Sequence, residues 1–326
     1  MAGAEGRFYA GVDLGGTNVR CAIVNAQAEV KSEVVKVKTP KEEGPDAVMD
    51  AIVTIIGKAA KSAGLSLQDI EAIGIGSPGP LNSDTGRIVY TPNLKGFENY
   101  PVTEKIMRAT GRPAVLEGDA NVACFGEWWA GAGRGTKSMV MFTLGTGVGG
   151  GIVLKGKILR GPDYTAGHLG HMIMDACGPT CGCGAKGCLE AFASATAVAR
   201  AAREALNAAG KKELGGVPVE KIESHDVAKA AAAGDEAMKK VLHDAGMKLG
   251  TAFVNVANVL DPELIVVGGG LVEAGELILG PAIECLRKHA LFPPREKVRV
   301  EKAALGDLAG IIGAAGCAKN RYATSR

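Results

Sequence analysis

Four residues between positions 171 and 188 have the types and the spacing of a tetrahedral metal site. They are His171, Cys181, Cys183 and Cys188, and Glu190 follows two residues after the last cysteine. Three thiolates and one imidazole fill the coordination shell of a structural zinc ion and leave no position open for a water molecule. We therefore expect a metal that clamps the chain and holds Glu190 beside it. The simpler alternative is a zinc site that stabilises only its own loop.

Three glycine-rich runs offer backbone that can approach a phosphate closely. The first contains Gly15 and Gly16 and follows Asp13, the second covers residues 145–147, and the third covers residues 268–270. Backbone N–H groups clustered in such turns form anion-binding nests. A single glycine pair more often serves an ordinary tight turn. Three runs in one chain favour a phosphate or nucleotide ligand.

The first glycine run is predicted to lie in a hairpin rather than at the start of a helix. Residues 8–37 form three strand-like runs, broken at positions 13–18 and 25–28. After the glycines, Val19, Cys21 and Ile23 recur with the two-residue period of a strand. A Rossmann or P-loop glycine run opens a helix, so a dinucleotide site of that kind is disfavoured.

The second glycine run repeats this arrangement, with an apolar strand before it and the strand 151–154 after it. Two similar hairpins predict an internal duplication. Helical patterns cover residues 46–63, 121–130, 193–208 and 224–260, and buried strand patterns cover residues 72–76, 114–117 and 264–267. Such alternation predicts an α/β protein.

The composition disfavours a nucleic-acid-binding, a membrane-bound and an exported protein. The chain has 326 residues, enough for two domains. Its 37 basic and 35 acidic residues give a net charge of +2, which favours neither nucleic acid nor an anionic membrane as a partner. The longest uncharged stretch, residues 138–154, is broken by glycines, so no membrane span is predicted. No signal or transit peptide is readable at residues 1–7, and we expect a cytoplasmic protein.

The eight cysteines do not predict a disulfide framework in a chain of this length without a signal peptide. Five of them lie outside the metal spacing, among apolar or small residues, where a cysteine behaves as a small hydrophobic side chain. These five are Cys21, Cys124, Cys177, Cys285 and Cys317. Cys177 is the uncertain case, because it lies four residues before Cys181, although the metal needs no fifth ligand.

The motifs, in this order, resemble those of the ROK family of sugar kinases, within the larger group of hexokinase, actin and the heat-shock ATPases. The likeness covers almost the whole chain, and the cysteine element is its most specific part. The other motifs that carry it are Asp13–Thr17, Thr91–Leu94, Asp119–Asn121, Leu144–Gly149, Gly170–His171 and Gly268–Gly270.

The resemblance implies a two-lobed, actin-like or hexokinase-like (ribonuclease H-like) ATPase fold with duplicated mixed-sheet domains. Residues 1–121 would form the small N-terminal domain, and residues 122–307 the large domain with the zinc-binding segment 171–188. A C-terminal helix at about residues 308–326 would pack back on the small domain. The lobes would close over sugar and ATP, because closure must exclude water from the phosphate.

The resemblance also implies roles for single residues. Asp119 would be the general base, which does not exclude the ordinary role of a helix N-cap. Asp13 would orient magnesium through water molecules. The proposed phosphate contacts are Gly15, Gly16, Thr17, Asn18, Thr146 and Gly147, and the residues beside the adenosine are Gly268, Gly269 and Gly270. The proposed sugar contacts are Gly79, Asn93, Asp119, His168, His171 and Glu190.

Two positions depart from the family pattern. Gly118 stands where an asparagine that contacts the sugar is usual, and His168 stands where a glutamate is usual. The loss of an amide and a carboxylate changes how hydroxyl groups can be recognised. His168 can bond a hydroxyl in place of the glutamate or serve as a packing residue, and both interpretations stay open.

The leading hypothesis is the ATP-dependent phosphorylation of glucose to glucose 6-phosphate. The alternatives are a kinase for another hexose or an N-acetylated amino sugar (fructose, mannose, N-acetylmannosamine or N-acetylglucosamine), and a non-catalytic ROK sugar-sensing regulator. Regulators carry a helix-turn-helix domain ahead of the sugar domain, whereas here the first phosphate hairpin begins at Asp13. The resemblance also implies a homodimer or homotetramer, because members of the family usually form dimers or tetramers. The sequence does not rank ATP against polyphosphate as the donor.

Overall fold

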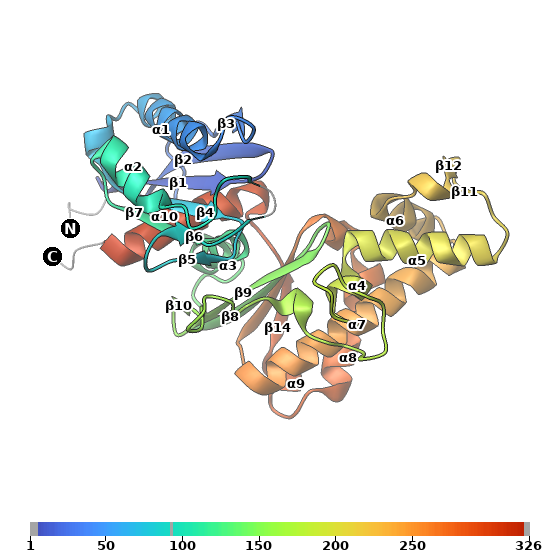
Figure 1. Ribbon diagram of the computed structural model, residues 1–326. Helices are drawn as coiled ribbons and strands as arrows, with labels where there is room; N and C mark the ends of the chain where they lie inside the picture. Colours follow the sequence, from blue (N-terminus) through green and yellow to red (C-terminus); the bar gives the residue numbers. More distant parts are fainter. Residues whose placement is uncertain (1–5, 92–93, 323–326) are drawn as a thin grey trace.

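Two hairpins with glycine turns start the two sheets of the protein (Figure 1). In the computed structural model, which describes residues 6–91 and 94–322, β1 (Phe8–Leu14) pairs with β2 (Asn18–Asn25) and β8 (Ser138–Leu144) pairs with β9 (Val148–Leu154). Apolar and β-branched residues dominate these strands, as is usual for half-buried or fully buried strands. The prediction that the first two glycine runs connect strands, and do not open helices, is confirmed.

Each hairpin is extended into a five-stranded mixed sheet with the same topology. The strand orders are β3-β2-β1-β4-β7 and β10-β9-β8-β13-β14. In each sheet the first two neighbouring pairs are antiparallel and the last two are parallel. The added strands are β3 (Val35–Lys38), β4 (Ile70–Ser77), β7 (Ala114–Gly118), β10 (Lys157–Ile158), β13 (Leu264–Gly268) and β14 (Arg299–Lys302). The predicted duplication of mixed sheets is therefore confirmed.

The helices cover the outer faces of both sheets and fill the space between them (Figure 1). The outer face of the first sheet carries α1 (Pro45–Ser62) and α2 (Val102–Thr110), and α3 (Asp119–Ala130) and α10 (Ala309–Tyr322) lie between the sheets. The outer face of the second sheet carries α5 (Ala195–Ala208), α6 (Ser224–Ala232), α7 (Glu236–Leu260) and α8 (Glu276–His289). None of the described helices is both long and apolar enough to cross a membrane.

Several short elements complete the described chain. The short α-helices are α4 (Glu190–Ala193) and α9 (Pro294–Lys297), and the 3-10 turns are η1 (Leu67–Asp69), η2 (Leu169–His171), η3 (Val219–Lys221), η4 (Gly270–Ala274) and η5 (Gly306–Leu308). Two small hairpins are formed by β5 (Leu81–Asn82) with β6 (Arg87–Ile88), and by β11 (Glu213–Leu214) with β12 (Val217–Pro218).

Glycines allow α10 to lie directly on the first sheet and on α3. A Cβ atom at Gly74 on β4 would stand 1.8 Å from the carbonyl oxygen of Ala314, and one at Gly313 would stand 1.7 Å from the carbonyl oxygen of Val122. No side chain fits at such distances, so both positions require glycine. α10 is the helix expected at about residues 308–326, of which residues 323–326 lie outside the described part of the chain.

One helical pattern needs correction. Residues 224–260 do not form a continuous helical stretch, because α6 ends at Ala232 and α7 begins at Glu236. Gly234 adopts a φ of 103°, and the side chain of Asp235 accepts the backbone N–H groups of Ala237 and Met238. A positive-φ glycine and a strong N-cap separate the two helices. The domain boundary expected after residue 121 falls inside α3.

The cysteines outside the metal segment are mostly core residues. Cys21, Cys124, Cys285 and Cys317 are buried, which confirms their prediction as small hydrophobic side chains. Cys177, the uncertain case among the five, is exposed and is not a core residue.

Candidate active site and metal centre

A large cavity lined by described residues, here called the main cavity, opens at the carboxyl ends of parallel strands in both sheets. Asp13 lies near the end of β1, Asp119 follows β7, and Gly268 ends β13. Parallel strands end at the same edge of a sheet, so their last residues come together there. The predicted site residues that line this cavity are Asp13, Gly79, Asp119, Thr146, Gly147, His171, Glu190, Gly268, Gly269 and Gly270.

A smaller cavity adjoins the main one. It shares Gly79 and Asp119 with the main cavity and is also lined by Gly118 and His168, the two positions that depart from the family pattern. Asp119 therefore lies in a wall common to both cavities. A group bound in the smaller cavity would meet a group bound in the main cavity at this carboxylate.

Two sets of predicted residues are not found in the cavity walls. The first set is Gly15, Gly16 and Thr17, which form the turn between β1 and β2, and Asn18, which begins β2. The N–H of Gly15 donates to the carbonyl of Asn18 at 3.0 Å, and none of the four lines either cavity. Asn93 lies outside the described residues. The β1–β2 turn nevertheless adjoins Asp13, which does line the main cavity.

Asp119 is the first residue of α3, and Gly118 is the residue that caps this helix. The N-cap interpretation of Asp119 is therefore wrong, although its Oδ1 accepts the backbone N–H of Ala120 at 2.7 Å. The cavity walls displace water around the carboxylate and raise the pKa of Asp119 above its usual value. The charge of Asp13 raises this pKa further, while the Ala120 N–H and His168 oppose the shift. A raised pKa makes this carboxylate a better proton acceptor.

Asp13 is paired with Arg20, a cavity residue that the sequence motifs did not single out. Arg20 donates to Oδ2 of Asp13 through Nη2 at 2.6 Å and Nε at 3.2 Å, and its Nη1 lies 3.4 Å from Oδ2 of Asp307. The antiparallel register of β1 and β2 places Asp13 directly opposite Arg20. Opposite charges at facing positions of a hairpin stabilise each other. This register would have revealed Arg20 once the hairpin was predicted.

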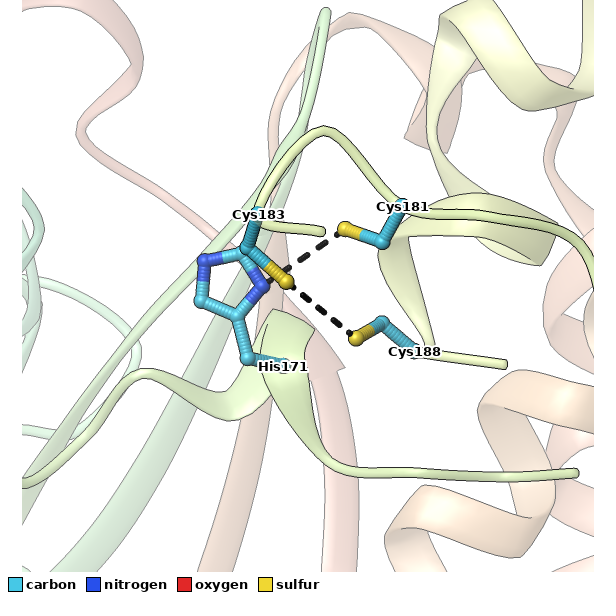
Figure 2. Close-up of side chains that lie close together, drawn as sticks. All are labelled: His171, Cys181, Cys183 and Cys188. Carbon is cyan, nitrogen blue, oxygen red and sulfur yellow. Dashed lines mark hydrogen bonds between the residues drawn. The ribbon is translucent and has the colours of Figure 1, made fainter. Parts of the chain in front are cut away.

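The four predicted metal ligands bring their donor atoms together (Figure 2). All four donor atoms lie within 4.8 Å of one another, with 3.8 Å between Nδ1 of His171 and Sγ of Cys181 and 3.7 Å between Sγ of Cys183 and Sγ of Cys188. Zinc–sulfur bonds of about 2.3 Å in a tetrahedral shell separate two sulfurs by about 3.8 Å. The residues and their spacing therefore fit a zinc ion. Cys177 is not part of this group.

Backbone hydrogen bonds shape the cysteine loop. The N–H of Cys181 donates to the carbonyl of Ala185 at 2.8 Å, and the N–H of Gly184 donates back to the carbonyl of Cys181 at 2.9 Å. Gly187 has a φ of 71°, and a Cβ atom there would stand 1.6 Å from the carbonyl oxygen of Asp175. This glycine allows the backbone of residue 187 to lie directly against that of Asp175 within the loop.

Glu190 joins the metal segment to the second glycine turn. Its Oε2 accepts the backbone N–H of Val148 at 3.0 Å, and the thiol of Cys181 lies 3.4 Å from its Oε1. A Cβ atom at Gly147 would stand 2.3 Å from Oε2, so the glycine is what allows the carboxylate to lie against the turn. Glu190 thus contacts both the metal segment and the turn between β8 and β9.

His168 and His171 stack with their ring centroids 6.2 Å apart and an angle of 16° between the rings. Nδ1 of His168 lies 2.6 Å from the carbonyl of Thr165, and because a carbonyl only accepts, this nitrogen is the donor. Nε2 of a neutral His168 is then an acceptor. His171 turns Nδ1 toward the sulfurs (Figure 2), so with a metal on Nδ1 its Nε2 carries the proton. The two rings can offer one acceptor and one donor.

Comparisons with known proteins agree with this architecture. A model of the ROK family matches residues 9–321. The glucokinase of Halalkalibacterium halodurans is 37% identical over 94% of this chain and 93% of its own length. The crystal structure of the ROK hexokinase from Thermus thermophilus matches with a TM-score of 0.82 and 34% identity, covering 96% of this chain and 98% of that chain.

A second solved structure is that of a ROK family glucokinase from Streptomyces griseus in complex with glucose and AMPPNP. It matches with a TM-score of 0.77 and 33% identity, covering 96% of this chain and 99% of that chain. These two structures confirm the predicted two-lobed, hexokinase-like fold. Because the family model spans almost the whole chain, this protein belongs to the ROK family.

Proposed function

We propose that this protein is a sugar kinase that transfers a phosphoryl group from ATP to glucose and releases glucose 6-phosphate and ADP. The observation that carries the proposal is the position of Asp119 in the wall shared by the two cavities. A hydroxyl group in front of this carboxylate would face a phosphate held by the glycine turns of the main cavity. Similarity to a glucokinase, and to a structure that binds glucose and AMPPNP, supports the same reaction.

Asp119 would accept the proton of the reacting hydroxyl. Phosphoryl transfer passes through a loose transition state, so the enzyme mainly has to position the reactants and neutralise charge. The raised pKa of Asp119 adds to its basicity. Closure of the cavity around the reactants would exclude water, which otherwise competes with the sugar for the phosphoryl group.

The nucleotide would lie in the main cavity. Backbone N–H groups at Thr146 and Gly147 would bind phosphate oxygens, and residues 268–270 would lie beside the adenosine. Gly15, Gly16, Thr17 and Asn18 remain proposed phosphate contacts, because their turn adjoins Asp13 and would approach the phosphates when the lobes close. Magnesium would offset the charge of the phosphates, with Asp13 as its water-mediated ligand and Arg20 fixing that carboxylate.

The sugar would lie against Asp119 and the two stacked histidines. A donor at His171 and an acceptor at His168 suit neighbouring hydroxyl groups, each of which can accept and donate. The remaining proposed sugar contacts are Gly79, Glu190 and Asn93, the last of which lies outside the described residues. Zinc would be held by His171, Cys181, Cys183 and Cys188, and as a structural ion it would fix the ring of His171 and the segment that leads to Glu190.

The two sheets suggest how the protein closes. Residues 1–121 together with α10 would form one lobe, and residues 122–307 the other, with α3 and α10 at the junction. We also propose that the protein is cytoplasmic and forms a homodimer or homotetramer. Sedimentation analysis of the purified protein would test the oligomeric state.

A coupled assay over a panel of sugars and donors tests the proposed function. Glucose, fructose, mannose, N-acetylmannosamine and N-acetylglucosamine should each be offered with ATP and with polyphosphate. The proposal predicts the highest kcat/KM for glucose with ATP. A protein that binds one of these sugars but phosphorylates none of the five would instead be the sugar-sensing regulator. A higher kcat/KM for another sugar than for glucose would make that sugar the substrate.

A further inference from the structure

An ion pair between Glu117 and Arg160 joins the two sheets next to Asp119. Glu117 lies near the end of β7 in the first sheet, and Arg160 follows β10 in the second. Nε of Arg160 donates to Oε2 of Glu117 at 2.6 Å. The side chain of Glu117 is only 4% exposed, whereas that of Arg160 is 38% exposed. A carboxylate this deeply buried requires a partner, and Arg160 supplies the opposite charge.

The other oxygen of Glu117 holds the chain on both sides of Asp119. Oε1 accepts the backbone N–H of Gly118 at 3.0 Å and Nδ2 of Asn121, also at 3.0 Å. Gly118 immediately precedes Asp119, and Asn121 lies in the first turn of α3. The carboxylate of Glu117 therefore fixes the junction between β7 and α3, and this junction sets where Asp119 points.

Arg160 begins a loop that lines part of the smaller cavity. We call residues 160–168 the strap, and its members Tyr164, Ala166, Gly167 and His168 line this cavity. The strap turns at Gly161 and Gly167, whose φ angles are 72° and 90°. The N–H of Ala166 donates to the carbonyl of Arg160 at 2.9 Å, so the strap is closed by its own backbone.

A second contact ties the strap to the first sheet's half of the protein. The hydroxyl of Tyr164 donates to Oδ2 of Asp84, in the turn between β5 and β6, at 2.7 Å. Asp84 is 72% exposed, so this bond competes with water and is the weaker of the two. The Arg160–Glu117 pair, whose carboxylate is buried, is therefore the stronger of these two contacts between the strap and the first sheet's half of the protein.

From this arrangement we propose that Arg160 is a positioning residue for the phosphoryl transfer. Through Glu117 it couples the strap, which carries His168 into the sugar cavity, to the β7–α3 junction, which carries Asp119. The position of the sugar and the position of the Asp119 carboxylate would then depend on each other. Arg160 would act through Glu117 and would not touch the reacting atoms. The inference rests on the proposed sugar kinase activity.

Steady-state kinetics of Arg160 variants test the inference. Arg160→Met removes the charge and keeps much of the side-chain length, and it should lower kcat/KM for the sugar by about 10- to 100-fold, the range that misplacement of catalytic groups causes. KM for ATP should change little, because the pair lies on the side of the smaller cavity. Arg160→Lys should recover part of the loss, since lysine keeps the charge but not the planar donor group.

The matched control is Arg108→Met, which removes an exposed arginine of α2 whose ion pair, among the described residues, is with Glu104 on its own helix. It should leave kcat, KM and Tm unchanged. If Arg160→Met does not fold, Glu117→Gln carries the same test, because the amide keeps an acceptor for Gly118 and loses the charge. The double variant Arg160→Met/Glu117→Gln should cost less in kcat/KM than the two single losses combined.

The outcomes separate this inference from the proposed function. Arg160→Met with kcat and KM within about twofold of the parent would overturn it, as would a loss confined to Tm or to the active fraction of the protein. Fully additive effects of the two substitutions would overturn it as well. A parent protein that phosphorylates no sugar would instead overturn the proposed function. Sugar phosphorylation by the parent and a sugar-specific loss in Arg160→Met support both.

Discussion

The carboxylate of Glu190 accepts the backbone N–H of Val148 at 3.0 Å, and its other oxygen lies 3.4 Å from the thiol of Cys181. One side chain thus connects the cysteine loop to the β8–β9 turn, which lines the main cavity. The metal segment is therefore part of the cavity wall rather than a separate loop. This relationship favours the interpretation in which zinc supports the substrate site over the one in which it stabilises only its own loop.

Replacing Glu190 should impair the enzyme more than it impairs the fold. Glu190→Ala leaves the Val148 N–H without its partner and removes a proposed sugar contact, and we expect kcat/KM for glucose to fall by about 10- to 100-fold, corresponding to the loss of one or two polar contacts. Glu190→Gln keeps an acceptor and should lose less. Equal kinetics of the parent and Glu190→Ala in the coupled assay would contradict this role.

The cysteine cluster should hold one zinc ion per chain. Cys183→Ser removes a thiolate and should lower both the zinc content, measured by mass spectrometry of the purified protein, and the Tm, because metal binding contributes to folding stability. KM for glucose should rise as the ring of His171 loses its anchor. Cys177→Ser is the control: this exposed residue lies outside the cluster and should retain zinc. A parent protein without stoichiometric zinc would show that the metal assignment is wrong.

The pH dependence of turnover should report the raised pKa of Asp119. A general base acts only when ionised, so activity should fall as the pH falls through its pKa. Because burial and the charge of Asp13 raise this pKa above 3.8, the acidic limb of kcat/KM should lie at a higher pH than for an ordinary aspartate. Asp13→Asn removes one of the raising charges and should move the limb to lower pH, whatever its effect on the maximal rate. A limb that stays in place or moves to higher pH in Asp13→Asn would contradict this explanation.

Two glycine substitutions should change stability in opposite directions. Gly74→Ala places a Cβ atom 1.8 Å from the Ala314 carbonyl, and we expect it to destabilise the fold by about 1–3 kcal/mol or more as α10 is pushed from the sheet. Gly57 lies inside α1, and apart from its neighbours and the adjacent backbone of the helix no described atom lies within 4 Å of an added Cβ. Gly57→Ala should therefore stabilise the protein by about 0.5–1 kcal/mol. Chemical denaturation of both variants checks the prediction, and equal free energies of unfolding would contradict the packing described for α10.

Local patterns predicted most of the fold because its elements depend on short-range periodicity. The alternation on both sides of Gly15 and Gly16 indicated a hairpin, and β1 and β2 form one. The break between α6 and α7 was not located from the sequence, because helical spacing continues on both sides of Gly234. The contact between β4 and α10 has no local signal, since Gly74 and Ala314 lie far apart in the chain.

The candidate site was predictable to the extent that its chemistry lies in short segments. The metal ligands occupy a single stretch, and their spacing alone indicated a cluster that the fold brings together. Arg20 was missed although the β1–β2 register places it opposite Asp13. The pair of Glu117 and Arg160 joins two different sheets, so only the assembled fold reveals it.

The most direct test of the account is the turnover of Asp119→Asn with glucose and ATP, measured through the formation of glucose 6-phosphate. The amide keeps the size of the carboxylate and cannot act as the base. We predict that kcat falls by about 10²- to 10⁴-fold, while the Tm and KM for ATP stay close to those of the parent. A variant that phosphorylates glucose at the rate of the parent would contradict the assignment of Asp119 as the base of a glucose kinase.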